Sequence, residues 1–282
     1  NIGMQSAHGT DVKCVSLPEF SDISNFCKEK EIKTVVVGPE QPLVDGVVDY
    51  LSEYDIQCFG PNQYASKIEG SKAFSKKFMK KHGIPTANFA SFDNYEDCAL
   101  YLESLHDKYV KEENEKRSAR ETDCDENLNC YCGDDCDINP NCYCPFRWVI
   151  KVSGLAAGKG VVLPKTFFEA YQVVKEMMID EKFGEAGNTI VIEDTLYGEE
   201  VSVFGFCNGR NTVLMPQAQD NKRIWDDDCG LNTGGMGAYA PVSVLTDQEL
   251  EELRRYMDIV VRELGYVGVL YAGIMKTIDG IF

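Results

Sequence analysis

The sequence predicts an α/β N-terminal part with a parallel sheet, followed by a second part of helices and hairpin-connected strands, and three observations lead to it. β-branched and apolar runs alternate with helical stretches before residue 65, a pattern typical of a parallel sheet. Beyond that point, long amphipathic helices lie between strands that are connected by hairpin turns such as Gly209-Arg210. A length of 282 residues is enough for two domains that each bury a core.

Charge and hydropathy argue against two classes of partner. The formal net charge is -18, whereas a nucleic-acid surface needs basic patches, so no nucleic acid partner is expected. No apolar run approaches the roughly 20 residues of a membrane helix and no signal peptide is recognisable, so we expect a cytoplasmic protein without a membrane partner. The chain begins with Asn1 rather than Met, and we expect the natural chain to extend beyond it.

The N-terminal part reads as alternating strands and helices. Strands are expected at residues 12–17, 34–37 and 56–59, with a helix at residues 47–54 before the last of them. In a parallel α/β sheet, ligands bind beyond the carboxyl ends of the strands. Gly38-Pro39-Glu40 stands at such an end, where it is either a ligand-binding loop or a rigid proline turn.

A basic amphipathic helix is expected over residues 66–82, with Gly83 ending it. Lys72 follows Gly70-Ser71 near the N-terminal part of that helix, where the helix dipole favours anions. Lys72 could therefore help to hold a phosphate. The alternative is that it is a solvated lysine, as Lys76 on the same helix is expected to be.

A helix over residues 95–106 is followed by a sharp change in composition. Residues 111–145 are charged, acidic and almost free of aliphatic side chains, so no packed core is expected there. They contain a tandem repeat of the form C-D-x-N-x-N-C-Y-C, at residues 124–132 and 136–144. Its cysteines could form a thiolate metal clip, or the repeat could be a duplicated surface insert without a metal.

The stretch around which the chain is organised runs over residues 149–162. Two β-rich runs flank small residues between Gly154 and Gly160, with Lys151 at a strand end and Lys159 at the loop tip. Small side chains let backbone N–H groups approach phosphate oxygens closely. The spacing is not that of a Walker A loop, which needs G-x-x-x-x-G-K-[ST]. Taken alone, the stretch fits a nucleotide-binding loop or a tight glycine hairpin.

Two polar clusters follow in the C-terminal half. A strand at residues 189–194 leads to Gly198-Glu199-Glu200, whose carboxylates could accept hydrogen bonds from an adenine amino group or ribose hydroxyls, or could be ordinary turn carboxylates. A polar, cationic cluster at residues 217–223 then precedes a glycine-rich run at residues 232–239. Residues 267–276 are expected to form a long buried strand.

Taken together, these segments resemble the glycinamide ribonucleotide synthetase family, the ATP-grasp ligases of early purine synthesis. The likeness covers nearly the whole chain apart from the cysteine-rich segment, and the motifs stand in the family's order. The matching segments are Gly38-Pro39-Glu40 with Pro42-Leu43, Glu69-Gly70-Ser71-Lys72-Ala73-Phe74, Gly154 to Val161, Gly198-Glu199-Glu200, Asn232 to Tyr239 and Leu270-Tyr271-Ala272-Gly273.

The resemblance implies a fold and a division of the chain. It implies a mixed α/β and α+β fold: a partial parallel-sheet N-terminal domain of the pre-ATP-grasp type at residues 1–65, followed by an ATP-grasp domain of two α+β subdomains at residues 66–282. A lid subdomain would span residues 86–194, approximately, and would carry the cysteine-rich insert at residues 111–145. Both domains would be truncated, one at each end of the chain.

The resemblance also implies site residues. Those expected to act directly in the reaction are Lys151, Asp220 and Arg223. Those expected to bind ATP are Lys72, Lys151, Gly158, Lys159, Gly160, Glu193, Asp194, Leu196 and Glu200. Those expected near the other substrates are Glu40, Asp220, Lys222, Arg223, Asn232, Thr233 and Gly234.

The family's reaction joins glycine to 5-phosphoribosylamine and yields glycinamide ribonucleotide, ADP and phosphate. Its chemistry passes through a glycyl phosphate, so it needs charge neutralisation and positioning more than a side-chain nucleophile. ATP and Mg²⁺ are the expected cofactors, with the Mg²⁺ ligands expected beyond Phe282, and the fragment itself is expected to be inactive. The context implied is a multifunctional purine-pathway polypeptide, and the alternative is a degenerate ATP-grasp module that binds a nucleotide as a regulator or scaffold.

Two positions depart from the family pattern. Val152-Ser153 stands where the family has Ala-Asp, and Leu231 stands where it has Pro. Both lie close to residues expected to contact ligands.

Overall fold

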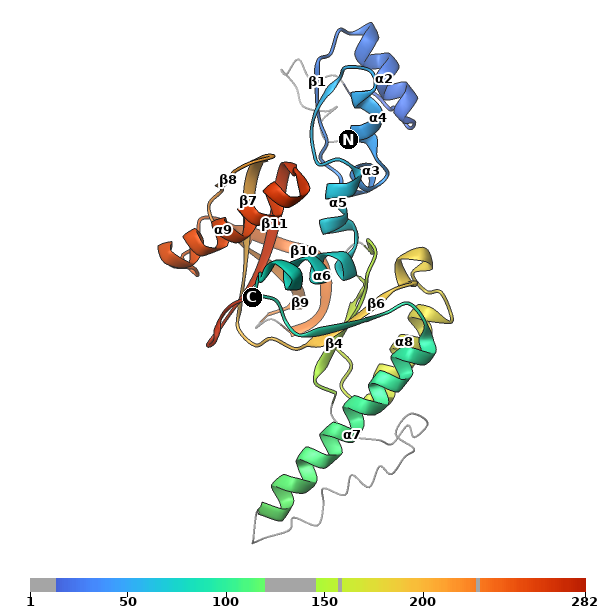
Figure 1. Ribbon diagram of the computed structural model, residues 1–282, viewed down its shortest axis with the longest axis vertical. Helices are drawn as coiled ribbons and strands as arrows, with labels where there is room; N and C mark the ends of the chain where they lie inside the picture. Colours follow the sequence, from blue (N-terminus) through green and yellow to red (C-terminus); the bar gives the residue numbers. More distant parts are fainter. Residues whose placement is uncertain (1–13, 120–145, 157–158, 227–228) are drawn as a thin grey trace.

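The computed structural model describes residues 14–119, 146–156, 159–226 and 229–282 (Figure 1). Buried apolar side chains form three clusters in these residues, one in the N-terminal part and one for each of two four-stranded sheets. The mixed α/β and α+β fold expected from the sequence is confirmed.

The N-terminal part contains one short parallel pair of strands. Its elements are α2 (Phe20–Glu29), β1 (Thr34–Val36), α3 (Glu40–Val44), α4 (Val47–Ser52) and β2 (Gln57–Phe59). β1 and β2 are parallel, with Val35 opposite Cys58, and Leu51 is fully buried in the cluster beside them. The strand expected over residues 12–17 does not appear in its described part, residues 14–17, because no described strand pairs with it.

The single basic helix expected from the sequence is two helices, α5 (Gln63–Gly70) and α6 (Lys72–His82). Ser71 separates them: its backbone is extended, with φ -141° and ψ 107°, and its hydroxyl accepts a hydrogen bond from an N–H of the first turn of α6. Gly70 and Ser71 favour such a break, because glycine is a poor helix former and serine a good N-cap. Lys72 is therefore the first residue of α6.

The first four-stranded sheet is antiparallel, in the order β3-β6-β4-β5. Its strands are β3 (Phe89–Phe92), β6 (Ile190–Asp194), β4 (Trp148–Val152) and β5 (Val161–Val162), and it packs with α7 (Tyr95–Ala119) and α8 (Phe167–Met178). Ile150, Ile192, Leu102 and Phe167 are each 0% exposed where strands and helices meet. The glycine-rich loop is the connection from β4 to β5.

α7 continues well past His106, where the sequence analysis expected it to end, and projects from the body of the molecule (Figure 1). Its last turns are rich in Glu, Lys and Arg, which are good helix formers, so local propensity extends the helix. The tandem cysteine repeat at residues 124–144 lies outside the described residues. Its metal-clip interpretation remains a hypothesis.

The second four-stranded sheet is antiparallel in the order β12-β11-β7-β8. Its strands are β7 (Glu199–Asn208), β8 (Thr212–Leu214), β11 (Val267–Thr277) and β12 (Gly280–Ile281). One face packs against α9 (Asp247–Leu264), which starts at a capping box of Thr246 and Glu249. A separate ribbon pairs β9 (Gln219–Trp225) with β10 (Cys229–Tyr239).

α6 lies between the two sheets and positions the site. Phe78 on one side of α6 belongs to the buried cluster of the second sheet, together with Val203 and Met257. Lys76 on another side reaches Glu193 at the end of β6 in the first sheet. Among the described helices, none has both the length and the apolar character to cross a membrane.

Candidate functional site

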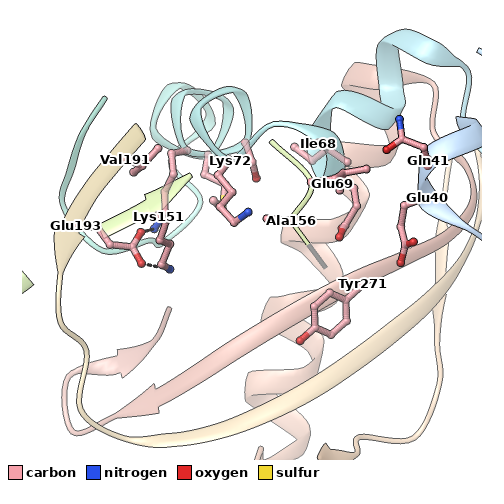
Figure 2. A pocket seen from close by; sticks show the side chains of 14 residues that line it. Glu40, Gln41, Ile68, Glu69, Lys72, Lys151, Ala156, Val191, Glu193 and Tyr271 are labelled. Carbon is pink, nitrogen blue, oxygen red and sulfur yellow. Dashed lines mark ion pairs between the residues drawn. The ribbon is translucent and has the colours of Figure 1, made fainter. Parts of the chain in front are cut away.

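A cavity of 710 Å³ lies between the two sheets and is bordered by α6 (Figure 2). Its wall combines side chains from α3, α5, α6, β4, the glycine-rich loop, β6 and β11. The residues that matter for its chemistry are Glu40, Glu69, Lys72, Lys76, Lys151, Glu193 and Tyr271.

Lys72 and Lys151, which come from α6 and β4, line this one cavity. The Lys72 ammonium donates a hydrogen bond of 3.3 Å to the carbonyl oxygen of Gly154, at the start of the glycine-rich loop. Burial, and then the neighbouring charge of Lys151, lower the pKa of Lys72 below its ordinary value. The two ammonium groups thus repel each other across a shared space, which an anion between them would relieve.

Glu193 holds two of the cavity's lysines. It is 6% exposed and forms ion pairs with Lys151 and, at 2.5 Å, with Lys76. Burial alone would raise the pKa of the Glu193 carboxyl, but the two ammonium groups together lower it below the ordinary value. Lys76 also donates a hydrogen bond of 2.6 Å to the Thr86 hydroxyl, which fixes its direction.

Lys76 is a site residue that the sequence analysis passed over as a solvated lysine. The signal was available, since Lys72 and Lys76 are four residues apart and residues at that spacing share one helix face. Lys72, Lys76, Lys151 and Glu193 together carry a net charge of +2 (three lysines and one carboxylate). In a chain of net charge -18, this concentration of positive charge marks a site for an anion.

The opposite end of the cavity is acidic. Glu69 and Glu40 lie there with Gln41, away from Glu193 and Lys151 (Figure 2). Burial, followed by the charge of Glu40, raises the pKa of the Glu69 carboxyl, and Lys72 partly opposes the rise. The sequence analysis did not single out Glu69, although it belongs to the motif that contains Lys72.

The glycine-rich loop contributes Leu155 and Ala156 to the cavity wall. Gly160 is buried, and a Cβ there would lie 2.3 Å from Val152, so the return of the loop to β5 requires glycine. Lys159 is exposed and does not line the cavity. Gly158 lies outside the described residues.

The expected adenine and ribose residues lie where β6 ends and β7 begins. Asp194 is bonded to Asn88 through its carboxylate, at 2.8 Å, and through its backbone N–H, at 3.0 Å. Leu196 follows in the connection to β7. Glu200 forms an ion pair of 3.0 Å with Lys222. Of this group only Glu193 lines the cavity.

The expected substrate residues after position 219 lie on the β9–β10 ribbon. Lys222 lies 3.8 Å from Asp220, and Arg223 donates a hydrogen bond of 2.7 Å to the Gly230 carbonyl within the ribbon. The hydroxyl of Thr233 donates a hydrogen bond of 2.9 Å to the Lys222 carbonyl. The ribbon also pairs Asn232 with Arg223, and Gly234 is exposed.

The described ribbon residues do not line the cavity, but Tyr271, which does, lies close enough to Lys222 to influence its pKa. Tyr271 lines the cavity from β11, and its phenol accepts or donates a hydrogen bond of 3.3 Å with the Ser202 hydroxyl. For Lys222, burial would lower the pKa, but the Glu200 hydrogen bond and the charges of Glu200, Tyr271 and Asp220 raise it overall. Tyr271 was quoted in a motif without a role, and no local sequence pattern would have placed its ring here.

The described residues contain no group of three or more His, Cys, Asp or Glu that could hold a metal ion. The Mg²⁺ ligands that the resemblance implies are expected beyond Phe282, so no chemical step is derived through the ion.

Two antiparallel sheets around a lysine-lined cavity, with a glycine-rich loop at its wall, define a protein of the ATP-grasp class. Comparison with known families agrees. The model of the phosphoribosylglycinamide synthetase ATP-grasp (A) domain matches residues 70–115 and 138–281, and the model of the N domain matches residues 1–69. The chain belongs to the phosphoribosylglycinamide synthetase family.

Its relatives include multifunctional purine-pathway proteins. The chain is 40% identical over 281 residues to the bifunctional purine biosynthetic protein PUR2,5 of Pichia angusta, covering 96% of this chain and 30% of that protein. It is 38% identical over 286 residues to the trifunctional purine biosynthetic protein adenosine-3 of Homo sapiens, covering 99% of this chain and 25% of that protein. The chain thus spans less than a third of the length of these relatives.

Among solved structures, the phosphoribosylamine–glycine ligase of Thermotoga maritima matches with a TM-score of 0.64 and 30% sequence identity. The match covers 88% of this chain and 53% of that one.

Proposed function

We propose that this chain binds ATP in the cavity between α6 and β4. We also propose that the protein to which it belongs ligates glycine to 5-phosphoribosylamine, forming glycinamide ribonucleotide, ADP and phosphate. The observation that carries the proposal is the convergence of Lys72, Lys76 and Lys151 on one cavity beside the glycine-rich loop. A polyphosphate suits this concentration of positive charge, and 710 Å³ lies in the size range of pockets that bind small molecules.

Lys72 and Lys151 are the proposed phosphate contacts. Lys151 is now paired with Glu193, and that carboxylate keeps a second partner in Lys76 when Lys151 turns to a phosphate. Exchange of one anionic partner for another leaves no charge buried alone. The backbone of the loop between Gly154 and Gly160, with Gly158, Lys159 and Gly160, would cover the phosphates and exclude water from the reacting groups.

The adenosine end would lie at the junction of β6 and β7. Glu193 and the backbones of Asp194 and Leu196 would line the adenine edge, and Glu200 would accept from the ribose hydroxyls. Glu193 supports this arrangement, because it lines the cavity beside Lys76 and Lys151 and directly precedes Asp194 at the end of β6.

The acceptor substrates would lie toward Glu40 and the β9–β10 ribbon, near the residues Asp220, Lys222, Arg223, Asn232, Thr233 and Gly234. A glycine carboxylate oxygen attacks the γ-phosphorus, and the bond from that phosphorus to ADP breaks. The nitrogen of phosphoribosylamine then attacks the carbonyl carbon of the glycyl phosphate, losing a proton as the carbon–oxygen bond to phosphate breaks. Lys151, with Asp220 and Arg223, would stabilise and orient the charges that develop.

The proposal extends to domain organisation and context. Residues 1–65 would form the N-terminal domain and residues 66–282 the ATP-grasp domain, with the lid at residues 86–194, approximately. The natural protein would be a cytoplasmic purine-pathway polypeptide that carries further enzyme domains, as the named relatives of Pichia angusta and Homo sapiens do.

Two measurements test the proposal. Calorimetric titration of the chain with ATP should show one site, and absence of binding would overturn it. A coupled assay on the full-length protein should show ADP release that requires both glycine and phosphoribosylamine. ATP binding without glycine-dependent ADP release would instead assign a nucleotide-binding regulatory or scaffold module.

A further inference from the structure

The N-terminus of α6 is closed by two serines rather than left open to an anion. The Lys72 N–H donates a hydrogen bond of 2.8 Å to the Ser153 carbonyl, and the Ala73 N–H donates one of 3.1 Å to the Ser153 hydroxyl. The Phe74 N–H donates to the Ser71 hydroxyl at 3.2 Å. These are three of the four donors that the start of a helix leaves without partners inside the helix. The dipole-based phosphate site expected at this helix is therefore already filled by protein atoms.

Ser153 is hydrogen-bonded both to the first sheet and to the start of α6. Its N–H donates a hydrogen bond of 2.8 Å to the Thr189 carbonyl, which ties it to the β6 side of the first sheet. Its hydroxyl shares a hydrogen bond of 3.1 Å with the Ser71 hydroxyl, and it is 5% exposed. We call these contacts of Ser153 with Ser71, Lys72 and Ala73 the serine clasp.

The serine clasp lies between the two proposed phosphate lysines. Ser153 directly follows β4 and stands two residues after Lys151, and side chains at that spacing in extended backbone point to the same side. On that side the Ser153 hydroxyl contacts α6. The backbone N–H of Lys72 donates to the Ser153 carbonyl within the clasp. The Lys72 ammonium donates to the carbonyl of Gly154, which directly follows Ser153. The clasp therefore fixes the position of α6 relative to β4 at the point where both lysines begin.

We propose that Ser153 is a positioning residue that sets the spacing of Lys72 and Lys151 for the phosphates of a nucleotide, through its hydrogen bonds to Ser71 and Ala73. The inference rests on the proposed ATP site. It concerns a residue that does not line the cavity. It gives a role to Ser153, which stands where the family has Asp.

Three variants at position 153 separate positioning from packing. Ser153→Ala removes the hydroxyl, and Ser153→Cys replaces a good acceptor with a weak one in a side chain of similar shape, since a thiol accepts hydrogen bonds weakly. Ser153→Asp supplies an acceptor again for the Ala73 N–H and the Ser71 hydroxyl. Its negative charge also suits a helix N-terminus. Ser24→Ala is the matched control, because Ser24 is a buried serine with one backbone hydrogen bond in α2.

The first readout is binding of ATP and of adenosine, each by competition with a fluorescent adenine nucleotide. Ser153→Ala and Ser153→Cys should weaken ATP binding about tenfold and adenosine binding less than about twofold, since misplaced lysines affect only the phosphates. Ser153→Asp and Ser24→Ala should bind ATP within about threefold of the unmodified chain. Unchanged ATP affinity in both loss variants, or equal losses for ATP and adenosine, would overturn the inference.

The second readout is amide hydrogen exchange of residues 72–74 without nucleotide. The Ala73 amide should lose protection in Ser153→Ala and keep it in Ser153→Asp, and unchanged protection in Ser153→Ala would overturn the clasp. A failure of the proposed function looks different, because the unmodified chain would then not bind ATP while its Ala73 amide remained protected.

Discussion

Lys151 and Glu193 form an ion pair across two adjacent antiparallel strands, β4 and β6. The register places Val149 opposite Glu193, so Lys151 reaches the carboxylate diagonally along the same face of the sheet. Lys76 reaches the same carboxylate from α6. One buried carboxylate thus holds a helix and a strand together and keeps two lysines at the cavity.

Glu193→Gln should lower the free energy of unfolding by about 3 kcal/mol, because two ammonium groups would lose their shared partner in a buried place. Urea denaturation measures the change. Glu176→Gln is the control: Glu176 pairs with Lys182 at 2.6 Å, but the two side chains are 48% and 57% exposed, so its loss should cost less than about 0.5 kcal/mol. Equal costs for the two variants would contradict a stabilising role for the buried carboxylate.

Lys151→Ala should weaken ATP binding about tenfold or more, because a charge-assisted phosphate contact is lost. The variant should fold, since Glu193 keeps its ion pair with Lys76. Titration calorimetry with ATP gives the affinity, and Lys182→Ala, which removes an exposed lysine, should leave it unchanged. If the two variants bind ATP equally well, Lys151 does not contact the nucleotide.

The affinity for ATP should fall at alkaline pH as the Lys72 side chain loses its proton. Burial and the charge of Lys151 lower the Lys72 pKa, so this side chain loses its proton at a lower pH than an ordinary lysine, whose pKa is about 10.4. Because the protonated form attracts phosphate, affinity should fall as pH rises through the lowered pKa. Lys72→Arg should move the fall to higher pH, since a guanidinium stays charged.

The control for that pH series is Lys77→Arg, a change at an exposed position of the same helix that should leave the profile unchanged. ATP dissociation constants measured across the alkaline range decide the matter. Coincident profiles for Lys72→Arg and the unmodified chain would show that another group causes the decline.

Gly154→Ala should destabilise the chain by about 2 kcal/mol, a typical cost of overpacking. A Cβ at Gly154 would lie 2.6 Å from the Ala186 Cα, and a backbone atom cannot move aside as a flexible side chain can. Gly38→Ala is the control, because a Cβ there meets nothing within 4 Å. Thermal unfolding of the two variants, side by side, should show a loss for Gly154→Ala alone, and similar midpoints would contradict the close packing of the loop.

Local patterns predicted most of the elements. The capping box at Thr246 and the glycine at position 265 bounded α9, and the β-branched run near Val35 marked a parallel strand, because such signals act over a few residues. The break at Ser71 was missed although Gly70-Ser71 signalled it, since the apolar stripe continues across the break. The end of α7 was missed because propensity, rather than core packing, extends it.

The site was predictable only in part. The motif containing Lys72 and the loop beside Lys151 indicated a phosphate site, whereas Lys76 looked like any other surface lysine. Its partner Glu193 stands more than a hundred residues away in the sequence. Tyr271 and Glu69 likewise reach the cavity from elements that no local pattern connects.

The sequence by itself determined the order of the elements, the glycine-rich loop and the lysines at its edges, since these depend on backbone propensity and spacing. The tertiary structure alone decided which charges meet, that Glu193 holds Lys76 and Lys151, and that Ser153 closes the start of α6. The reason is physical: ion pairs and helix caps between distant segments depend on distances of a few ångströms, and these exist only once the two sheets have packed around α6.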